Sequence, residues 1–186
     1  MKRLARTVAL VAFATAVAAS GIGAAAGPGK GRIQRAGVIF TSKATHLSRT
    51  TCKGAGGKPI VVTKLVFVGT SRGFDPRLAG DFVFRGTMVN SVDVVGYVTG
   101  TIRVRNPKTG DGLRATFQAT TRGMTDGSSL MDGFITGQAQ KPSMQLFANF
   151  TAHDDPVKHT LVGNFGFNGP VAPHNSTVLF VGGCPG

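Results

Sequence analysis

The segment Ala115-Thr116-Phe117-Gln118-Ala119-Thr120 decides the fold class, because its apolar side chains occupy every second position. In an extended chain, successive side chains point to opposite faces, so the apolar residues share one face and the polar residues the other. The same period recurs in 163–167 and along 97–105, and no helical stripe competes with it. The sequence therefore predicts an all-β protein.

Nine strands are expected, separated by short segments of turn residues at 106–112, 125–127 and 154–156. The predicted strands are 37–47, 60–68, 81–90, 94–105, 113–121, 129–138, 143–152, 159–167 and 176–181. Short connections favour an antiparallel meander over crossover connections. Because closing such a sheet removes its exposed edges, we predict a barrel of eight or nine strands, with a two-sheet sandwich as the alternative.

Glycine and phenylalanine positions bear on how the barrel closes and what fills it. Glycines within or at the ends of the predicted strands are expected to mark bulges or sharp bends. They are Gly69, Gly86, Gly96, Gly100, Gly137 and Gly163. The chain has 13 Phe and no Trp, which predicts a well-filled apolar interior. The Phe residues expected in the core are Phe82, Phe84, Phe117, Phe134, Phe147, Phe150, Phe165, Phe167 and Phe180.

The glycine-bearing strands 97–102, 131–137 and 161–165 resemble those of secreted bacterial barrels of the calycin type. They also resemble the barrel shared by allene oxide cyclases and dirigent proteins. The resemblance covers most of the mature chain, but the Gly-x-Trp signature of lipocalins is missing, because the chain contains no Trp. It is a likeness of shape, so it implies a barrel and no particular activity.

The first 26 residues are expected to be a secretory signal peptide. A positive region with Lys2, Arg3 and Arg6 precedes the apolar stretch 8–19, and the small residues 24–26 offer a cleavage site. Cleavage after Ala19 and a retained membrane anchor are the alternatives, although the stretch is richer in Ala and Gly than a typical anchor. We therefore expect a secreted or cell-envelope protein with a basic, flexible arm at 27–36 and a single domain at 37–186.

The two cysteines, Cys52 and Cys184, are expected to form one disulfide, since export carries them to an oxidising compartment. Closing so long a loop would stabilise the fold by about 4 to 5 kcal/mol. Two free thiols or a metal-binding pair are the alternatives. Neither cysteine has another Cys or a His at ligand spacing, which disfavours the metal pair.

The chain is strongly basic, with a formal net charge of +13, eight Asp and no Glu. Most of the excess lies between residues 27 and 85, where eleven Lys or Arg accompany two Asp. This side is expected to attract anionic wall polymers, acidic glycans or phospholipid headgroups, whereas a merely solvated face is the alternative. Specific nucleic-acid recognition is not expected, because surface aromatic residues do not alternate with the basic ones. The candidate basic surface is Lys30, Arg32, Arg35, Lys43, Arg49, Lys53 and Lys58.

One connection gathers His153, Asp154, Asp155 and His159, whose side chains suit a divalent metal. A solvated turn is the alternative interpretation. Without Glu, a glycosidase with paired Glu residues is excluded. No other catalytic set is evident and no cofactor is expected.

The sequence thus predicts a secreted, non-enzymatic barrel that binds a small apolar ligand or an anionic surface polymer. A cofactor-free isomerase or cyclase, or a wall-associated structural component, are the alternatives. An enzyme of this kind would need an Asp or His with a partner inside the barrel.

Overall fold

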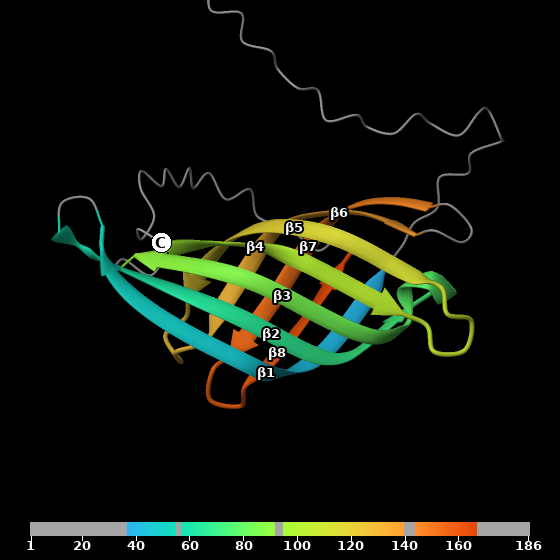
Figure 1. The fold of residues 1–186 in the computed structure, drawn as a ribbon, viewed down its shortest axis with the longest axis horizontal. Helices are drawn as coiled ribbons and strands as arrows, with labels where there is room; N and C mark the ends of the chain where they lie inside the picture. The colour runs from blue at the N-terminus through green and yellow to red at the C-terminus, as the bar shows by residue number, and fades with distance from the viewer. Residues whose placement is uncertain (1–36, 55–56, 92–94, 140–143, 167–186) are drawn as a thin grey trace, which may run out of the picture. The chain divides into compact units, whose positions relative to one another are not determined.

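The computed structural model describes residues 37–54, 57–91, 95–139 and 144–166. In these residues, eight antiparallel strands form a closed barrel in which each strand pairs with the next and β8 pairs with β1 (Figure 1). The strands are β1 (Val38–Lys53), β2 (Pro59–Gly73), β3 (Gly80–Ser91), β4 (Val95–Arg105), β5 (Gly112–Gly123), β6 (Ser129–Ala139), β7 (Met144–Asp155) and β8 (Thr160–Phe165). The predicted meander barrel is therefore confirmed. The predicted strand 176–181 lies outside the described residues, as do the segments 1–26 and 27–36.

Alternation along each strand fills the barrel with apolar side chains. In β5, every second residue from Leu113 to Thr121 is buried. The largest fully buried side chains include seven Phe rings, which are Phe40, Phe67, Phe82, Phe84, Phe117, Phe150 and Phe165. Their centroids approach to 4.4 Å for Phe40 and Phe82, and to 4.6 Å for Phe84 and Phe117. The centre of the barrel is thus packed with aromatic rings.

Two Phe residues predicted for the core lie on the outer face instead. Phe134 is 57% exposed and Phe147 is 77% exposed. Both fall out of phase with the buried positions of their strands, which include Ile135 in β6 and Leu146 in β7. Phe40 and Phe67 belong to the core but were absent from the predicted set, and Phe167 and Phe180 lie outside the described residues.

The strand glycines allow close packing rather than marking bulges. Among the described strand pairs, the register shifts at one place, between Ala44 and His46 in β1. Gly86 and Gly100 lie opposite each other, and a Cβ on Gly100 would lie 1.9 Å from the carbonyl oxygen of Arg85. Glycine there permits close approach of β3 and β4. Gly69, Gly96, Gly137 and Gly163 likewise lie in continuous ladders.

The β1–β2 hairpin is longer than the rest of the sheet and extends beyond the barrel (Figure 1). Residues 38–43 of β1 pair with both β2 and β8, whereas residues 46–53 pair only with β2 within the described part of the chain. Cys52 lies in this extension. Because Cys184 is outside the described residues, the predicted disulfide remains a prediction.

The turns between the strands lie where the sequence predicts them, except near residue 155. Turns occupy 107–109 and 125–126, as expected, but Asp154 and Asp155 still belong to β7 and the last turn is 156–159. A single turn of 3-10 helix, η2 (Pro76–Leu78), joins β2 to β3. Within the described ranges, no helix has the length and apolar character needed to cross a membrane.

Candidate functional site

Three arginine side chains line a hollow of about 270 Å³ at the end of the barrel where β4 turns into β5. Arg103 and Arg105 lie on β4 and Arg114 lies on β5. Their side chains point outward, because the adjacent residues Val104 and Leu113 point inward and are buried in the core. The register places Arg103 directly opposite Arg114. The lining consists of Arg103, Val104, Arg105, Gly110, Asp111, Gly112, Leu113, Arg114 and Gln138.

The β4–β5 loop that borders the hollow is held by its own hydrogen bonds. The backbone N–H of Asn106 donates to the carbonyl oxygen of Asp111 at 2.7 Å, and that of Gly110 donates to Asn106 at 2.9 Å. Gly110 has a φ of 74°, a left-handed conformation that favours glycine. The side-chain amide of Asn106 donates to the carbonyl oxygen of Pro76 at 2.9 Å, which fastens the loop to η2. The rim of the hollow is therefore structured.

The arginine side chains of the hollow are exposed, and no hydrogen bond or ion pair joins any of their guanidinium groups to another described residue. Arg77, near the same end of the barrel, does have an acidic partner, because its Nε donates to the carboxyl of Asp75 at 2.8 Å. This hydrogen bond lowers the pKa of the Asp75 carboxyl. Asp111 is the acidic residue of the lining, so the lining side chains carry three positive charges and one negative charge. Guanidinium groups without a protein partner are suited to binding carboxylate, phosphate or sulfate groups.

The basic surface continues across the outer face of the neighbouring strands. The register runs from Val83 in β3 through Arg103 and Arg114 to Gln138 in β6. Arg85 lies two residues from Val83 on the same face of β3 and is also exposed. The amide of Gln138 adds a hydrogen-bond donor and acceptor beside Arg114. Arg85, Arg103, Arg105, Arg114 and Gln138 together form a band of cationic and amide groups across β3 to β6, which we call the arginine row.

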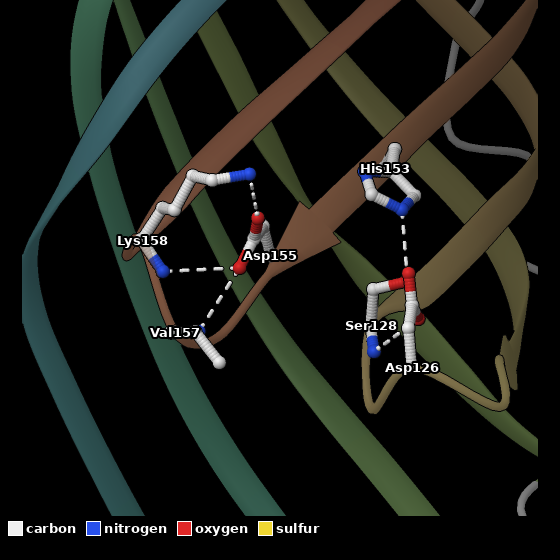
Figure 2. Close-up of polar contacts among 6 residues, drawn as sticks. All are labelled: Asp126, Ser128, His153, Asp155, Val157 and Lys158. Atoms are coloured by element: carbon white, nitrogen blue, oxygen red, sulfur yellow. Dashed lines mark hydrogen bonds and ion pairs between the residues drawn. The ribbon is translucent and has the colours of Figure 1, made fainter.

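A second polar cluster lies at the opposite end of the barrel, where the β5–β6 turn lies beside the end of β7 (Figure 2). The hydroxyl of Ser128 lies 2.5 Å from Oδ1 of Asp126 and 2.8 Å from Nε2 of His153. An ionised carboxylate can only accept, so the hydroxyl donates to Asp126 and Nε2–H of His153 donates to the hydroxyl. These bonds from Ser128 lower the pKa of Asp126. His153 is thus not placed to take a proton from Ser128, as a nucleophile–base pair requires.

The structure does not bring the predicted metal ligands together. His153 bonds to Ser128, whereas Asp155 accepts from the backbone N–H groups of Val157 and Lys158 at 3.0 Å and pairs with the Lys158 ammonium at 2.9 Å (Figure 2). Asp154 faces the interior and His159 lies exposed in the turn. Strand alternation separates side chains that are adjacent in the sequence. No group of three or more His, Cys or acidic residues positioned to hold a metal occurs in the described part of the chain.

Asp154 is the acidic residue that β7 turns inward. It is 8% exposed, and burial raises the pKa of its carboxyl to about 6, while His153 and His159 act in the opposite direction. No hydrogen bond or ion pair joins the Asp154 carboxyl group to another described residue. The enzyme alternative requires an Asp or His inside the barrel together with a partner side chain. Among the described residues, Asp154 is such an Asp, but its carboxyl has no hydrogen-bonding partner.

The basic residues singled out from the sequence are not those of the hollow. Lys43, Arg49, Lys53 and Lys58 are exposed on β1 and the β1–β2 connection. In an up-and-down barrel this connection lies at the end opposite the β4–β5 loop. Lys30, Arg32 and Arg35 lie outside the described residues. The sequence showed Arg103 and Arg105 on the polar face of a strand, but their juxtaposition with Arg114 depends on register.

Comparison with protein-family models, curated proteins and solved structures finds no match to this chain. The resemblance to calycin-type barrels stays a prediction.

Proposed function

We propose that this is an exported, non-enzymatic β-barrel protein that binds an anionic polymer outside the cell through the arginine row of its outer face. The observation that carries the proposal is the direct opposition of Arg103 and Arg114, beside Arg105, around a surface hollow. Like charges directly opposite each other destabilise a sheet. An anion bound between them would remove that repulsion.

The packing of the barrel interior favours the outer face as the binding surface. Seven Phe rings with less than 2% exposure occupy the centre of the barrel. A small apolar ligand would have to displace these rings, whereas the hollow is open to solvent. The net positive charge of the chain would increase the rate of encounter with an anionic polymer.

Export and the Cys52–Cys184 bridge belong to the same proposal. An anionic envelope or matrix polymer is met only after the signal peptide has directed the chain out of the cytoplasm. Attachment to such a polymer would also serve the wall-associated structural role predicted as an alternative. Electrostatic attachment predicts that high salt releases the protein from cells, because salt screens exposed charges.

The test compares two double variants that lose the same charge at opposite ends of the barrel. Arg103→Gln/Arg114→Gln removes the opposed pair, and Arg49→Gln/Arg122→Gln removes two exposed arginines at the other end. Binding of the mature protein to polyphosphate is measured by calorimetry at several salt concentrations. We expect the first variant to bind at least about tenfold more weakly than the second. Equal losses in both variants would mean that only net charge matters and would refute a defined site.

A further inference from the structure

A pair of exposed aromatic rings lies close to the arginine row. Phe134 in β6 and Phe147 in β7 have ring centroids 6.1 Å apart and planes within 17° of parallel. Phe134 is opposite Asn149 and Phe147 is opposite Thr136, so the two rings are diagonal neighbours on the outer face. More than half of each side chain is exposed. The barrel thus presents two nearly parallel rings to solvent although its interior has taken up seven others.

The surface around these rings is mostly polar among the described residues, and the charged side chain next to Phe134 is Asp132, two residues away on the same face of β6. The rows of outward residues that contain the rings cross β4 to β7 without a single charged side chain. Their members are Thr99, Thr101, Thr116, Gln118, Phe134, Thr136, Phe147 and Asn149. The hydroxyls of Thr116 and Thr136 lie 3.2 Å apart, and each keeps further capacity to bond outward. Apolar rings surrounded by hydroxyl and amide groups match a sugar ring, which has an apolar C–H face and hydroxyl edges.

The register places this surface directly beside the arginine row. Phe147 lies opposite Thr136, and Thr136 opposite Thr116, two residues along β5 from Arg114. With strands about 4.8 Å apart and a rise of about 3.4 Å per residue, the backbones at Phe147 and Arg114 are roughly 12 Å apart. A few linked sugar rings span that distance. One chain could therefore contact the Phe pair and the arginines at once.

We infer that the anionic polymer is an acidic polysaccharide, with sugar rings stacked on Phe134 and Phe147 and carboxylate or sulfate groups held by Arg103 and Arg114. The inference rests on the proposed function and specifies its ligand. Charge complementarity supports it on the arginine side, and the hydroxyl and amide groups in the rows that contain the Phe rings support it on the aromatic side. A single-stranded nucleic acid also combines rings with negative charge, but it carries a phosphate at every nucleotide. Among the described residues, the rows that contain the Phe pair offer no cation to those phosphates between β4 and β7.

The experiment uses polygalacturonate, its fully methyl-esterified form, polyphosphate and an oligothymidylate as four probes. The mature protein is compared with Phe134→Ala/Phe147→Ala and with Arg103→Gln/Arg114→Gln. Phe74→Ala is the control for loss of an exposed ring, because Phe74 is 89% exposed and lies in the β2–β3 connection. Circular dichroism checks that each variant keeps the fold.

We expect the Phe double variant to bind polygalacturonate about tenfold more weakly and to bind polyphosphate as the unaltered protein does. The Arg double variant should lose affinity for both, and Phe74→Ala for neither. Methyl-esterified polymer should bind weakly, since it lacks the charges. If the Phe double variant binds polygalacturonate normally while the Arg variant does not, the inference is overturned and the proposed function stands. If the Arg variant binds both anions normally, the proposed function fails as well. Tighter binding of oligothymidylate than of polygalacturonate would identify a nucleic acid as the ligand and overturn the inference.

Discussion

Arg103 and Arg114 lie directly opposite each other on β4 and β5, and neither guanidinium has a hydrogen-bonding or ionic partner among the described residues. Arg77 near the same end of the barrel, by contrast, pairs with Asp75. A cross-strand pair of like charges opposes folding and at the same time creates a place for an anion. Stability and binding should therefore respond in opposite directions when one of the two arginines is removed.

Arg114→Gln should stabilise the protein at low ionic strength while weakening its binding of polyanions. Relief of the repulsion is expected to raise the free energy of unfolding by about 0.2 to 1 kcal/mol. In about 1 M NaCl, where the Debye length is near 3 Å, the gain should vanish. Urea unfolding at both salt concentrations measures it. Arg122→Gln is the control, because Arg122 lies opposite the uncharged Leu130. If Arg114→Gln is the less stable protein at low salt, a counter-charge already neutralises the pair.

Asp154→Asn should stabilise the protein at neutral pH and have little effect in acid. The pKa of the buried Asp154 carboxyl is raised from 3.8 to about 6. Between these values the native state holds the proton more tightly than the unfolded chain does, so stability falls as pH rises through this window. Asp154→Asn has no carboxyl to ionise, so it avoids this decrease in the free energy of unfolding. In the unaltered protein the decrease amounts to at most about 3 kcal/mol above pH 6. Thermal unfolding from pH 3.5 to 8 measures the difference between the two proteins.

Asp155→Asn provides a control of opposite sign for the Asp154 prediction. Hydrogen bonds from Lys158 hold the pKa of the Asp155 carboxyl below its ordinary value. This carboxylate therefore favours the native state at neutral pH, and its contribution is lost as pH falls through the folded pKa. The control should be less stable than the unaltered protein at pH 7 and approach it in acid. If both variants shift stability in the same direction at pH 7, the inward and outward environments of the two carboxyls have been assigned wrongly.

Alternation predicted the strands well because it is a local property, and errors arose where residue type was used in place of the phase of alternation. Residues 115–120 give both the strand and its buried face, since their pattern is strict. Phe134 and Phe147 were assigned to the core by residue type, although Ile135 and Leu146 fix the opposite phase. The residues of the predicted metal site are not gathered for a related reason. Asp154 points to the opposite face of β7 from its neighbours His153 and Asp155.

The arginine row depends on strand register, which a single sequence does not contain. Arg103 and Arg114 are separated by a loop whose length alone does not determine which residues face each other. Asn106 closes that loop by donating its backbone N–H to Asp111 and by accepting from the backbone N–H groups of Lys108 and Gly110, so that the two arginines align. Their positions on polar strand faces were visible in the sequence, but their opposition was not. Binding surfaces on a barrel exterior are hard to predict for this reason.

Gly100→Ala should destabilise the barrel more than its exposed neighbour Thr99→Ala does. A Cβ at residue 100 would lie 1.9 Å from the carbonyl oxygen of Arg85 and 2.7 Å from Cα of Gly86. Because both obstacles are backbone atoms, β3 and β4 would have to separate, and we expect a loss of about 1 to 3 kcal/mol. Chemical denaturation of both variants provides the comparison. Equal, small effects would show that the two strands can move apart without weakening the core.

Cys52→Ser should lower the stability of the exported protein by about 4 to 5 kcal/mol if the predicted disulfide forms. Cys52 lies in the part of β1 that extends past β8, where β2 is the strand that pairs with β1 among the described residues. A covalent link from this extension to Cys184 would limit the freedom of the chain end in the unfolded state. Mass spectrometry after alkylation without reductant should show no modified thiol in the unaltered protein. Cys52→Ser/Cys184→Ser should be as unstable as the single variant, because either change removes the same bond. Alkylation of both cysteines in the folded, oxidised protein would exclude the bridge and leave the β1 extension held by hydrogen bonds to β2.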